Sequence, residues 1–247
     1  MRSLEVEGLT KRYPGFTLGE VSFSLEQGRI MGLIGRNGAG KSTTLKAMLN
    51  MVRPDGGTIR MLGRDFRRDE AACKRELGVV LGSIPFYQTK RLETITEVTR
   101  RFYRNWDDAA YQKYMSLFEL DERKQVKQLS EGMKVKYMIA LALSHDAKLF
   151  LFDEPTSGLD PVAREDLLEL FRALVKDGRR SVLFSTHITS DLDKCADDIT
   201  YIRNGQIVAS AGKADFFQMF RSLRTPGEDS LDLEEIMVRN ERGTYHV

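Results

Sequence analysis

Short apolar runs recur along the chain, and polar stretches long enough for helices separate many of them. Most of the runs are continuously apolar rather than alternating, which is typical of strands buried on both faces of a parallel sheet. Asn204-Gly205, just before the last run, favours a tight hairpin turn. The predicted strands are residues 4–6, 21–25, 30–34, 58–62, 77–81, 149–152, 181–185, 199–202 and 206–209.

The clearest helical pattern spans residues 161–176. Asp160 is a suitable N-cap, Pro161 fits the first turn, and Gly178 is suited to end the helix. An apolar stripe along one face predicts that this helix packs on a sheet. Its members are Leu167, Leu170, Phe171 and Leu174.

The middle of the chain differs from its two ends. Residues 85–144 contain no strand-like run and are rich in charge and helix formers, which indicates a helical subdomain. We therefore predict an α/β core built from residues 1–84 and 145–222, interrupted by this subdomain. Residues 223–247 form a tail with a short helix packed on the core.

Composition narrows the class of protein. The 247 residues include 38 basic and 36 acidic side chains, a net charge of +2 that gives no electrostatic argument for nucleic-acid binding. Cys73 and Cys195 lie far apart, which argues against a disulfide framework or a cysteine-based zinc site. No apolar run approaches the length of a membrane helix. We expect a soluble, cytoplasmic protein that acts at a membrane only through a partner.

One segment carries the strongest chemical signal. It follows the apolar run 30–34, precedes a helix-compatible run and fits the phosphate-loop pattern G-x-x-x-x-G-K-[ST]. In such a loop backbone N–H groups surround the phosphates, Lys41 reaches the β- and γ-phosphates, and Ser42 ligates Mg²⁺. An ordinary glycine-rich turn is the alternative. The predicted nucleotide-binding residues are Gly35, Arg36, Asn37, Gly38, Ala39, Gly40, Lys41, Ser42 and Thr43.

Two adjacent carboxylates end the apolar strand at residues 149–152. The carboxyl ends of parallel strands are where an α/β sheet presents ligand-binding groups. We expect Asp153 to hold Mg²⁺ through water, and Glu154 to polarise the water that attacks the γ-phosphate. Lys41, Glu154 and His187 are the predicted catalytic residues, and Ser42 and Asp153 the metal ligands.

Two further motifs identify a family. Leu129-Ser-Glu-Gly-Met133 precedes an apolar helix, and Ser157-Gly-Leu-Asp160 follows the acidic strand. With the phosphate loop, the acidic pair and His187, this order resembles the ATP-binding-cassette ATPases along nearly the whole chain. Taken alone, residues 129–133 would also fit a helix-capping turn.

The resemblance implies a RecA-like P-loop NTPase core with an antiparallel β edge and an inserted helical subdomain. It implies a head-to-tail dimer in which Ser130 and Gly132 of one copy grip the γ-phosphate of ATP bound to the other. His187 would orient the attacking water, Asp160 would lie in the D-loop beside the nucleotide, and Tyr13 would stack on adenine.

Cofactors and partners follow from the same resemblance. They are ATP, Mg²⁺, an integral-membrane permease, and a second identical or closely related cassette. The cassette itself would be peripheral, on the inner face of the cell membrane. Residues 102–107 and 232–237 look like segments of single-cassette ATPases that serve exporters of antibiotics and antimicrobial peptides.

Two departures from the family pattern stand out. Glu131 and Met133 differ from the commonest signature LSGGQ. Gly82 stands where the family usually has a glutamine, so that Gln88 or Ser83 is left as a substitute. This puts the Mg²⁺ contact and the coupling to the permease in question, but not ATP binding.

Three alternatives remain at this stage. A cassette ATPase acting on nucleic acid or ribosomes usually carries two cassettes or long insertions, which this chain lacks. A nucleotide kinase or GTPase would share the phosphate loop but not the motifs at 129–133 and 157–160. A cassette that binds ATP without turnover is disfavoured by Glu154 and His187, whereas Gly82 leaves it open.

Overall fold

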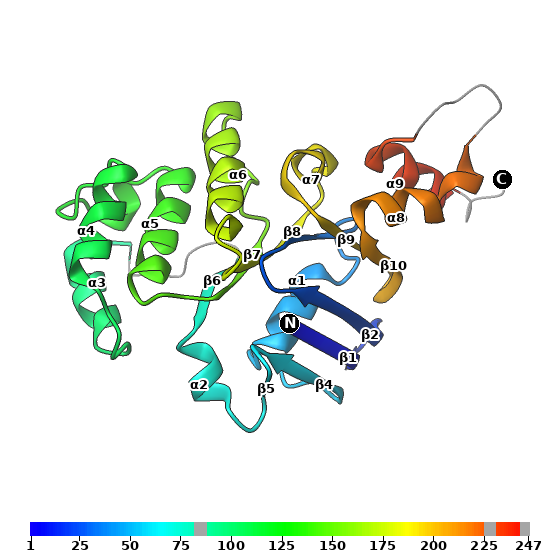
Figure 1. The fold of residues 1–247 in the computed structure, drawn as a ribbon, viewed down its shortest axis with the longest axis horizontal. Helices are drawn as coiled ribbons and strands as arrows, with labels where there is room; N and C mark the ends of the chain where they lie inside the picture. The colour runs from blue at the N-terminus through cyan, green and yellow to red at the C-terminus, as the bar shows by residue number, and fades with distance from the viewer. Residues whose placement is uncertain (82–87, 225–230, 243–247) are drawn as a thin grey trace.

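The computed structural model describes residues 1–81, 88–224 and 231–242. In this part of the chain, a six-stranded sheet with the order β10-β9-β3-β8-β7-β6 forms the centre of the molecule (Figure 1). Its strands pair in parallel except β10, which runs antiparallel to β9 after the Asn204-Gly205 turn. The strands are β3 (Ile30–Ile34), β6 (Leu77–Leu81), β7 (Leu149–Asp153), β8 (Ser181–Thr186), β9 (Asp198–Arg203) and β10 (Gln206–Gly212).

Both faces of this sheet are covered, which explains why its strands are continuously apolar. On β3, Ile30 and Ile34 face one core cluster, while Met31 and Leu33 face the other. The first cluster packs against helices α6 (Pro161–Val175), α7 (Thr189–Cys195) and α8 (Lys213–Met219). The second packs against α1 (Lys41–Met48) and a smaller sheet.

The smaller sheet is antiparallel with the order β2-β1-β4-β5, which confirms the β edge expected near the N-terminus. β1 (Arg2–Tyr13) and β2 (Phe16–Glu26) are far longer than the short apolar runs that predicted them. Buried and more exposed positions alternate along much of β2, so a search for apolar runs finds only residues 21–25, near its C-terminal end. β4 is Gly56–Met61, and the two-residue β5 (Arg64–Asp65) was not predicted.

A helical segment that lies between the two halves of the core in the sequence has its own apolar cluster. A buried hydroxyl group organises it, because Thr96 Oγ1 lies 2.8 Å from both Tyr111 OH and Tyr137 OH. Burial raises the pKa of Tyr111 to about 12. The elements are α3 (Leu92–Arg100), α4 (Asp108–Leu117), the 3₁₀ turn Val126–Gln128 and α5 (Glu131–Ser144). The limits of the three predicted domains remain a prediction.

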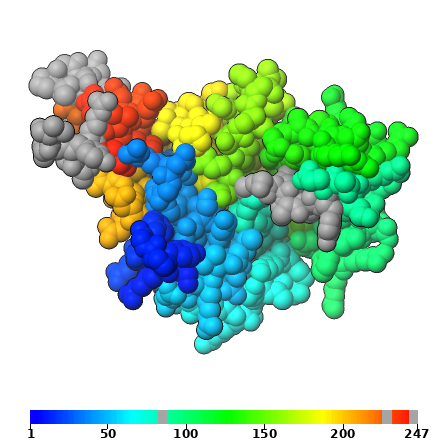
Figure 2. Space-filling model, turned by 180° about the vertical axis from the view of Figure 1, so that it is seen from behind, coloured from blue at the N-terminus to red at the C-terminus, as the bar shows by residue number. Residues whose placement is uncertain are grey.

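The helical segment and the C-terminal helices lie at opposite ends of the long axis (Figures 1 and 2). Helix α9 (Leu233–Arg242) packs on the core through Leu233, Ile236 and Met237, after the buried Leu231. The remaining short elements are α2 (Glu70–Lys74) and a 3₁₀ turn at Arg221–Leu223. Within the described residues, no helix combines the length and apolar character needed to cross a membrane.

Candidate functional site

The phosphate loop joins the carboxyl end of β3 to the first turn of α1. Gly40 has a φ of +114°, which L side chains rarely adopt, and a Cβ on Gly35 would lie 2.3 Å from the carbonyl oxygen of Ile202. Both glycines are therefore required by the shape of the turn. The loop borders a cavity of about 410 Å³. Lining residues are Phe16, Arg36, Asn37, Gly38, Gly40, Lys41, Ser42, Thr43 and Glu154.

Lys41 is the buried cation of this cavity, with a side chain only 5% exposed. Its Nζ donates to the carbonyl oxygens of Gly35 at 2.7 Å and Arg36 at 3.3 Å. Glu154 Oε1 lies 3.2 Å from the same nitrogen. The ammonium group is thus held inside the loop by oxygen atoms, at the entrance to α1, where the amides of the helix N-terminus also favour an anion.

The acidic pair stands at the end of β7, beside β8. Asp153 is buried, and its Oδ1 accepts a hydrogen bond of 2.6 Å from the Ser185 hydroxyl. That hydroxyl also accepts from the Glu154 backbone N–H at 3.0 Å. Glu154 has a φ of +51°, an unusual value for a residue with a Cβ. This backbone turn separates the two neighbouring carboxylates and aims Glu154 at the cavity.

His187 follows β8 and reaches the same carboxylate from the other side. Its Nδ1 lies 2.8 Å from Glu154 Oε2, within hydrogen-bonding distance. The turn after the strand is fixed by Thr186, whose Oγ1 accepts from the Ile188 backbone N–H at 2.9 Å. Glu154 is therefore placed between a lysine and a histidine. This arrangement fits the prediction that Glu154 is a general base and His187 its orienting partner.

The other predicted nucleotide contacts lie on separate elements. Ser130 caps α5, with its Oγ accepting from the Met133 backbone N–H at 3.2 Å, and Gly132 is buried in the first turn. Asp160 caps α6 by accepting from Ala163 and Val162, both at 3.0 Å, and these bonds hold the pKa of its carboxyl below the usual value. The described residues that line the phosphate-loop cavity do not include Ser130, Gly132 or Asp160.

A family model described as ABC transporter matches residues 18–157, more than half of the chain, including the phosphate loop and the acidic pair. The chain belongs to the ABC transporter family. It is an ATP-binding and ATP-hydrolysing subunit of that family, and the matches give no support to the nucleic-acid alternative.

Two curated relatives and one solved structure match most of this chain. The ABC-type transporter ATP-binding protein EcsA of Bacillus subtilis is 32% identical over 240 residues, covering 95% of this chain and 96% of EcsA. The linearmycin resistance ATP-binding protein LnrL of the same organism is 32% identical over 218 residues, covering 86% and 70%. A solved structure of the ATP-binding subunit of an ABC transporter has a TM-score of 0.83 at 29% identity, covering 95% and 98%. These comparisons confirm the fold class and the predicted family.

An aromatic side chain that the sequence analysis did not predict lines the phosphate-loop cavity. Tyr13, at the end of β1, is 40% exposed, and Lys11 Nζ lies 5.6 Å from its ring centroid. Phe16, which pairs with Tyr13 across the turn, lines the cavity itself. Sequence inspection missed Phe16, which becomes part of the site only because β2 packs beside the phosphate loop. Adenine stacking on Tyr13 remains a prediction.

Three positions were considered for the family's glutamine and its substitutes, and the structure describes one of them, Gln88. Gly82 and Ser83 lie outside the described residues. Gln88 is exposed, and its backbone carbonyl accepts a hydrogen bond of 3.0 Å from the Lys127 N–H. That bond ties its backbone to the helical segment.

The oxygen donors of the site suit Mg²⁺. Ser42 lines the cavity beside Lys41, and Asp153 ends the adjacent strand β7. Among the residues that the structure describes, no cluster of three or more His, Cys, Asp or Glu side chains could cage a metal ion. Mg²⁺ is usually held by one or two protein oxygens, nucleotide phosphates and water, so a serine and one carboxylate fit it.

Ser185 is a positioning residue that the sequence did not single out as part of the site. Replacing Ser185 with alanine removes a fully buried hydroxyl that orients Asp153, and we expect a roughly tenfold fall in kcat, in the range for lost outer-shell partners. Steady-state ATPase kinetics measure it. Ser181→Ala is the matched control, since that buried hydroxyl on the same strand bonds to Ser3, away from the site. Equal kcat values for the two variants would contradict this role.

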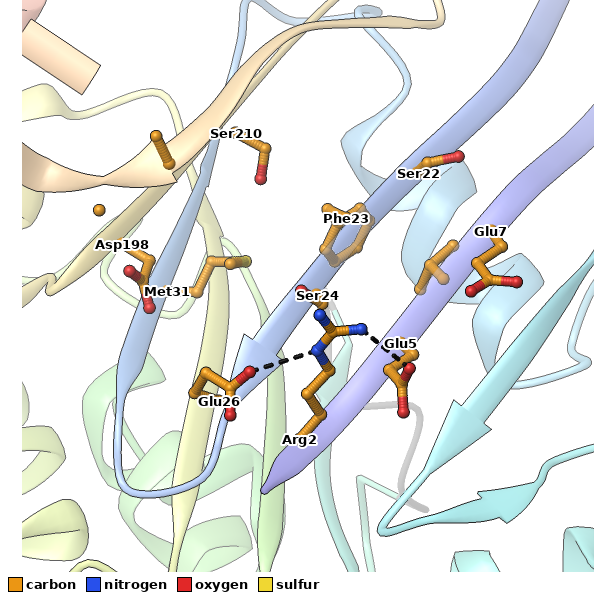
Figure 3. A pocket seen from close by; sticks show the side chains of 13 residues that line it. Arg2, Glu5, Glu7, Ser22, Phe23, Ser24, Glu26, Met31, Asp198 and Ser210 are labelled. Atoms are coloured by element: carbon orange, nitrogen blue, oxygen red, sulfur yellow. Dashed lines mark hydrogen bonds and ion pairs between the residues drawn. The ribbon is translucent and has the colours of Figure 1, made fainter. Parts of the chain in front are cut away.

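A second cleft, of about 450 Å³, lies between the two sheets and is unrelated to this chemistry. Arg2 donates there to Glu5 at 3.1 Å and to Glu26 at 3.2 Å (Figure 3). None of the predicted site residues lines it. The cleft is a seam between β1, β2 and β10, where one arginine is paired with two carboxylates.

Proposed function

We propose that this cassette, acting as a homodimer with Mg²⁺ on the inner face of the cell membrane, hydrolyses ATP to drive export through a separate permease. The observation that carries the hydrolytic part is the placement of Glu154 between Lys41 and His187. The linearmycin resistance function of LnrL and the segments 102–107 and 232–237 support export of an antibiotic-like substrate.

In the proposed mechanism, each of these side chains has a separate role. When ATP binds, the Lys41 ammonium group gives up a contact with a carbonyl or carboxylate oxygen and contacts phosphate oxygens instead. Glu154 accepts the proton of the attacking water, while His187 holds the carboxylate and contacts the γ-phosphate. Mg²⁺, when bound by Ser42 and Asp153, neutralises phosphate charge.

The position of the signature supports the proposed dimer. Ser130 is exposed at the N-terminus of the fourteen-residue helix α5, whose amides favour a negative charge, yet it is not part of its own chain's cavity. A second copy facing head to tail would bring Ser130 and Gly132 to the γ-phosphate. Release of phosphate after hydrolysis would then weaken the dimer, as in other γ-phosphate switches.

A cavity of about 360 Å³ between the core and the helical segment is the proposed docking groove for the permease. Tyr103 stacks on His145 there, with ring centroids 3.7 Å apart. Burial lowers the pKa of His145 to about 4, so its ring stays neutral near pH 7. Apart from Lys74 and Thr99, the groove is therefore an aromatic and aliphatic surface, and its histidine carries no charge. Its lining is Leu49, Met51, Lys74, Leu77, Val79, Thr99, Tyr103, Met138, Leu141, Ala142 and His145.

Copurification from detergent-solubilised membranes tests the proposal. We expect a multi-span membrane protein to be recovered with the wild-type cassette in a fixed ratio. Met51→Asp should abolish recovery without changing basal ATPase activity, because Met51 is 62% exposed and lines the groove. Val98→Asp is the control, since Val98 is 52% exposed on α3 but does not line the groove. Undiminished recovery with Met51→Asp would refute docking at this groove.

A further inference from the structure

Helix α9, near the C-terminus, contacts the phosphate loop through its last turn. Leu233 and Ile236 are fully buried and fix one side of the helix in the main core. At the other end of α9, Asn240 accepts from Arg203 Nη1 through both its backbone oxygen and its side-chain oxygen, each at 2.7 Å. The last turn is thus anchored to β9, the strand next to β3.

Glu241 is the residue that makes the connection. Its side chain is 17% exposed, and its Oε1 accepts a hydrogen bond of 3.0 Å from the hydroxyl of Tyr201, a fully buried residue of β9. Its Oε2 lies 3.7 Å from Arg36 Nη1. A carboxylate held by the sheet is therefore paired with the side chain that follows the first glycine of the phosphate loop.

Arg36 stands between two cavities. It lines the phosphate-loop cavity and also a neighbouring cavity of about 610 Å³, which His187 shares with residues of α9. The Arg36 backbone is held independently of its side chain, because its carbonyl accepts from Lys41 Nζ at 3.3 Å and from the Ala39 N–H at 3.0 Å. Its guanidinium group, on a side chain that is 64% exposed, has room to lie in either cavity and is paired with Glu241.

We propose that Glu241 is a positioning residue that holds the Arg36 guanidinium group away from the phosphates and thereby lowers the affinity of the loop for ATP. ATP carries several negative charges, so the Glu241 carboxylate both repels it and competes with it for Arg36. Binding of the nucleotide must then release Arg36 from α9. The inference rests on ATP binding by this chain and does not depend on the permease or the dimer.

Glu241→Gln is the sharpest test. Glutamine keeps an oxygen for the Tyr201 hydroxyl and leaves the buried face of α9 intact, so it removes little besides the charge. Exposed ion pairs contribute up to about 1 kcal/mol, and we therefore expect the Kd for ATP of the full chain to fall about threefold to fivefold at low salt. The gain should shrink as ionic strength rises. Glu241→Asp, which keeps the carboxylate, should restore much of the wild-type Kd.

Two comparisons separate this role from a bulk charge effect. Glu234→Gln makes the same charge change on the same helix and in the same cavity, two turns from Glu241, and should alter the Kd by less than about 1.5-fold. In an Arg36→Gln background, Glu241→Gln should no longer tighten binding, because the side chain through which it acts is gone.

The proposal has definite ways to fail. An unchanged or raised Kd for Glu241→Gln would overturn it, as would an equal gain in the Arg36→Gln background or with Glu234→Gln. Thermal melting of each variant shows whether α9 has stayed docked. Absence of ATP binding by the wild-type chain would instead contradict the function of the cassette itself.

Discussion

Replacing Glu154 with glutamine is expected to reduce steady-state ATP hydrolysis about a thousandfold while leaving ATP binding intact, within the range for loss of a general base. The amide keeps the shape of the side chain and a hydrogen bond to His187, but it cannot accept a proton from water. It also frees Lys41 from the carboxylate 3.2 Å away, so affinity for ATP should hold or rise. Phosphate release measures the first effect, and equilibrium binding of ATP the second.

The same variant tests the dimer. With hydrolysis blocked, Mg-ATP should hold two copies together, and size-exclusion chromatography should show a dimer with ATP but a monomer with ADP. Glu169→Gln, an exposed residue of α6, is the matched control and should behave as wild type. A Glu154→Gln variant that turns over ATP within tenfold of the wild-type rate would remove Glu154 from the role of base.

The continuous apolar runs predicted the parallel strands well, because burial on both faces leaves no polar position to interrupt the pattern. The antiparallel sheet was predicted less completely. β1 and β2 carry polar residues on their more exposed faces, so only residues 4–6 and 21–25, near one end of each strand, were predicted. The two-residue β5 has no periodicity to detect, since its pairing with β4 depends on the turn between them.

The predicted chemistry of the site came from motifs, whereas its geometry depends on contacts between distant strands. Nothing local indicates that Ser185 bonds to Asp153, 32 residues away, or that Glu154 adopts a positive φ. Phe16 and Glu241 were missed for the same reason. Each is ordinary in its own segment and becomes part of the site only when β2 or α9 is packed against the phosphate loop.

At Ser130 and Asp160, the family motif and local helix capping both favour the same residue. Both are N-caps, and a capping residue is what the local sequence alone would predict. Capping acts within one chain, whereas a contact to nucleotide on a second copy requires two. That distinction depends on the arrangement of two chains, which the dimer experiment with Glu154→Gln tests directly.

Replacing Lys41 with methionine should weaken ATP binding at least about a hundredfold, which corresponds to about 2.7 kcal/mol. Methionine fills much of the space of the buried lysine stem but supplies no cation. The loop would then face the phosphates with the Gly35 and Arg36 carbonyl oxygens and the Glu154 carboxylate, all of which now surround the ammonium group. Equilibrium binding of ATP measures the loss.

A double variant separates the repulsion of ATP by Glu154 from the loss of its attraction to Lys41. If Glu154 repels phosphate once Lys41 is gone, the double variant Lys41→Met, Glu154→Gln should bind ATP more tightly than Lys41→Met alone. Lys46→Met removes an exposed lysine from the same helix and should leave the Kd within twofold of wild type. A Lys41→Met protein that is folded by thermal melting and binds ATP within fivefold of wild type would mean that the backbone of the loop, rather than this ammonium group, supplies most of the affinity.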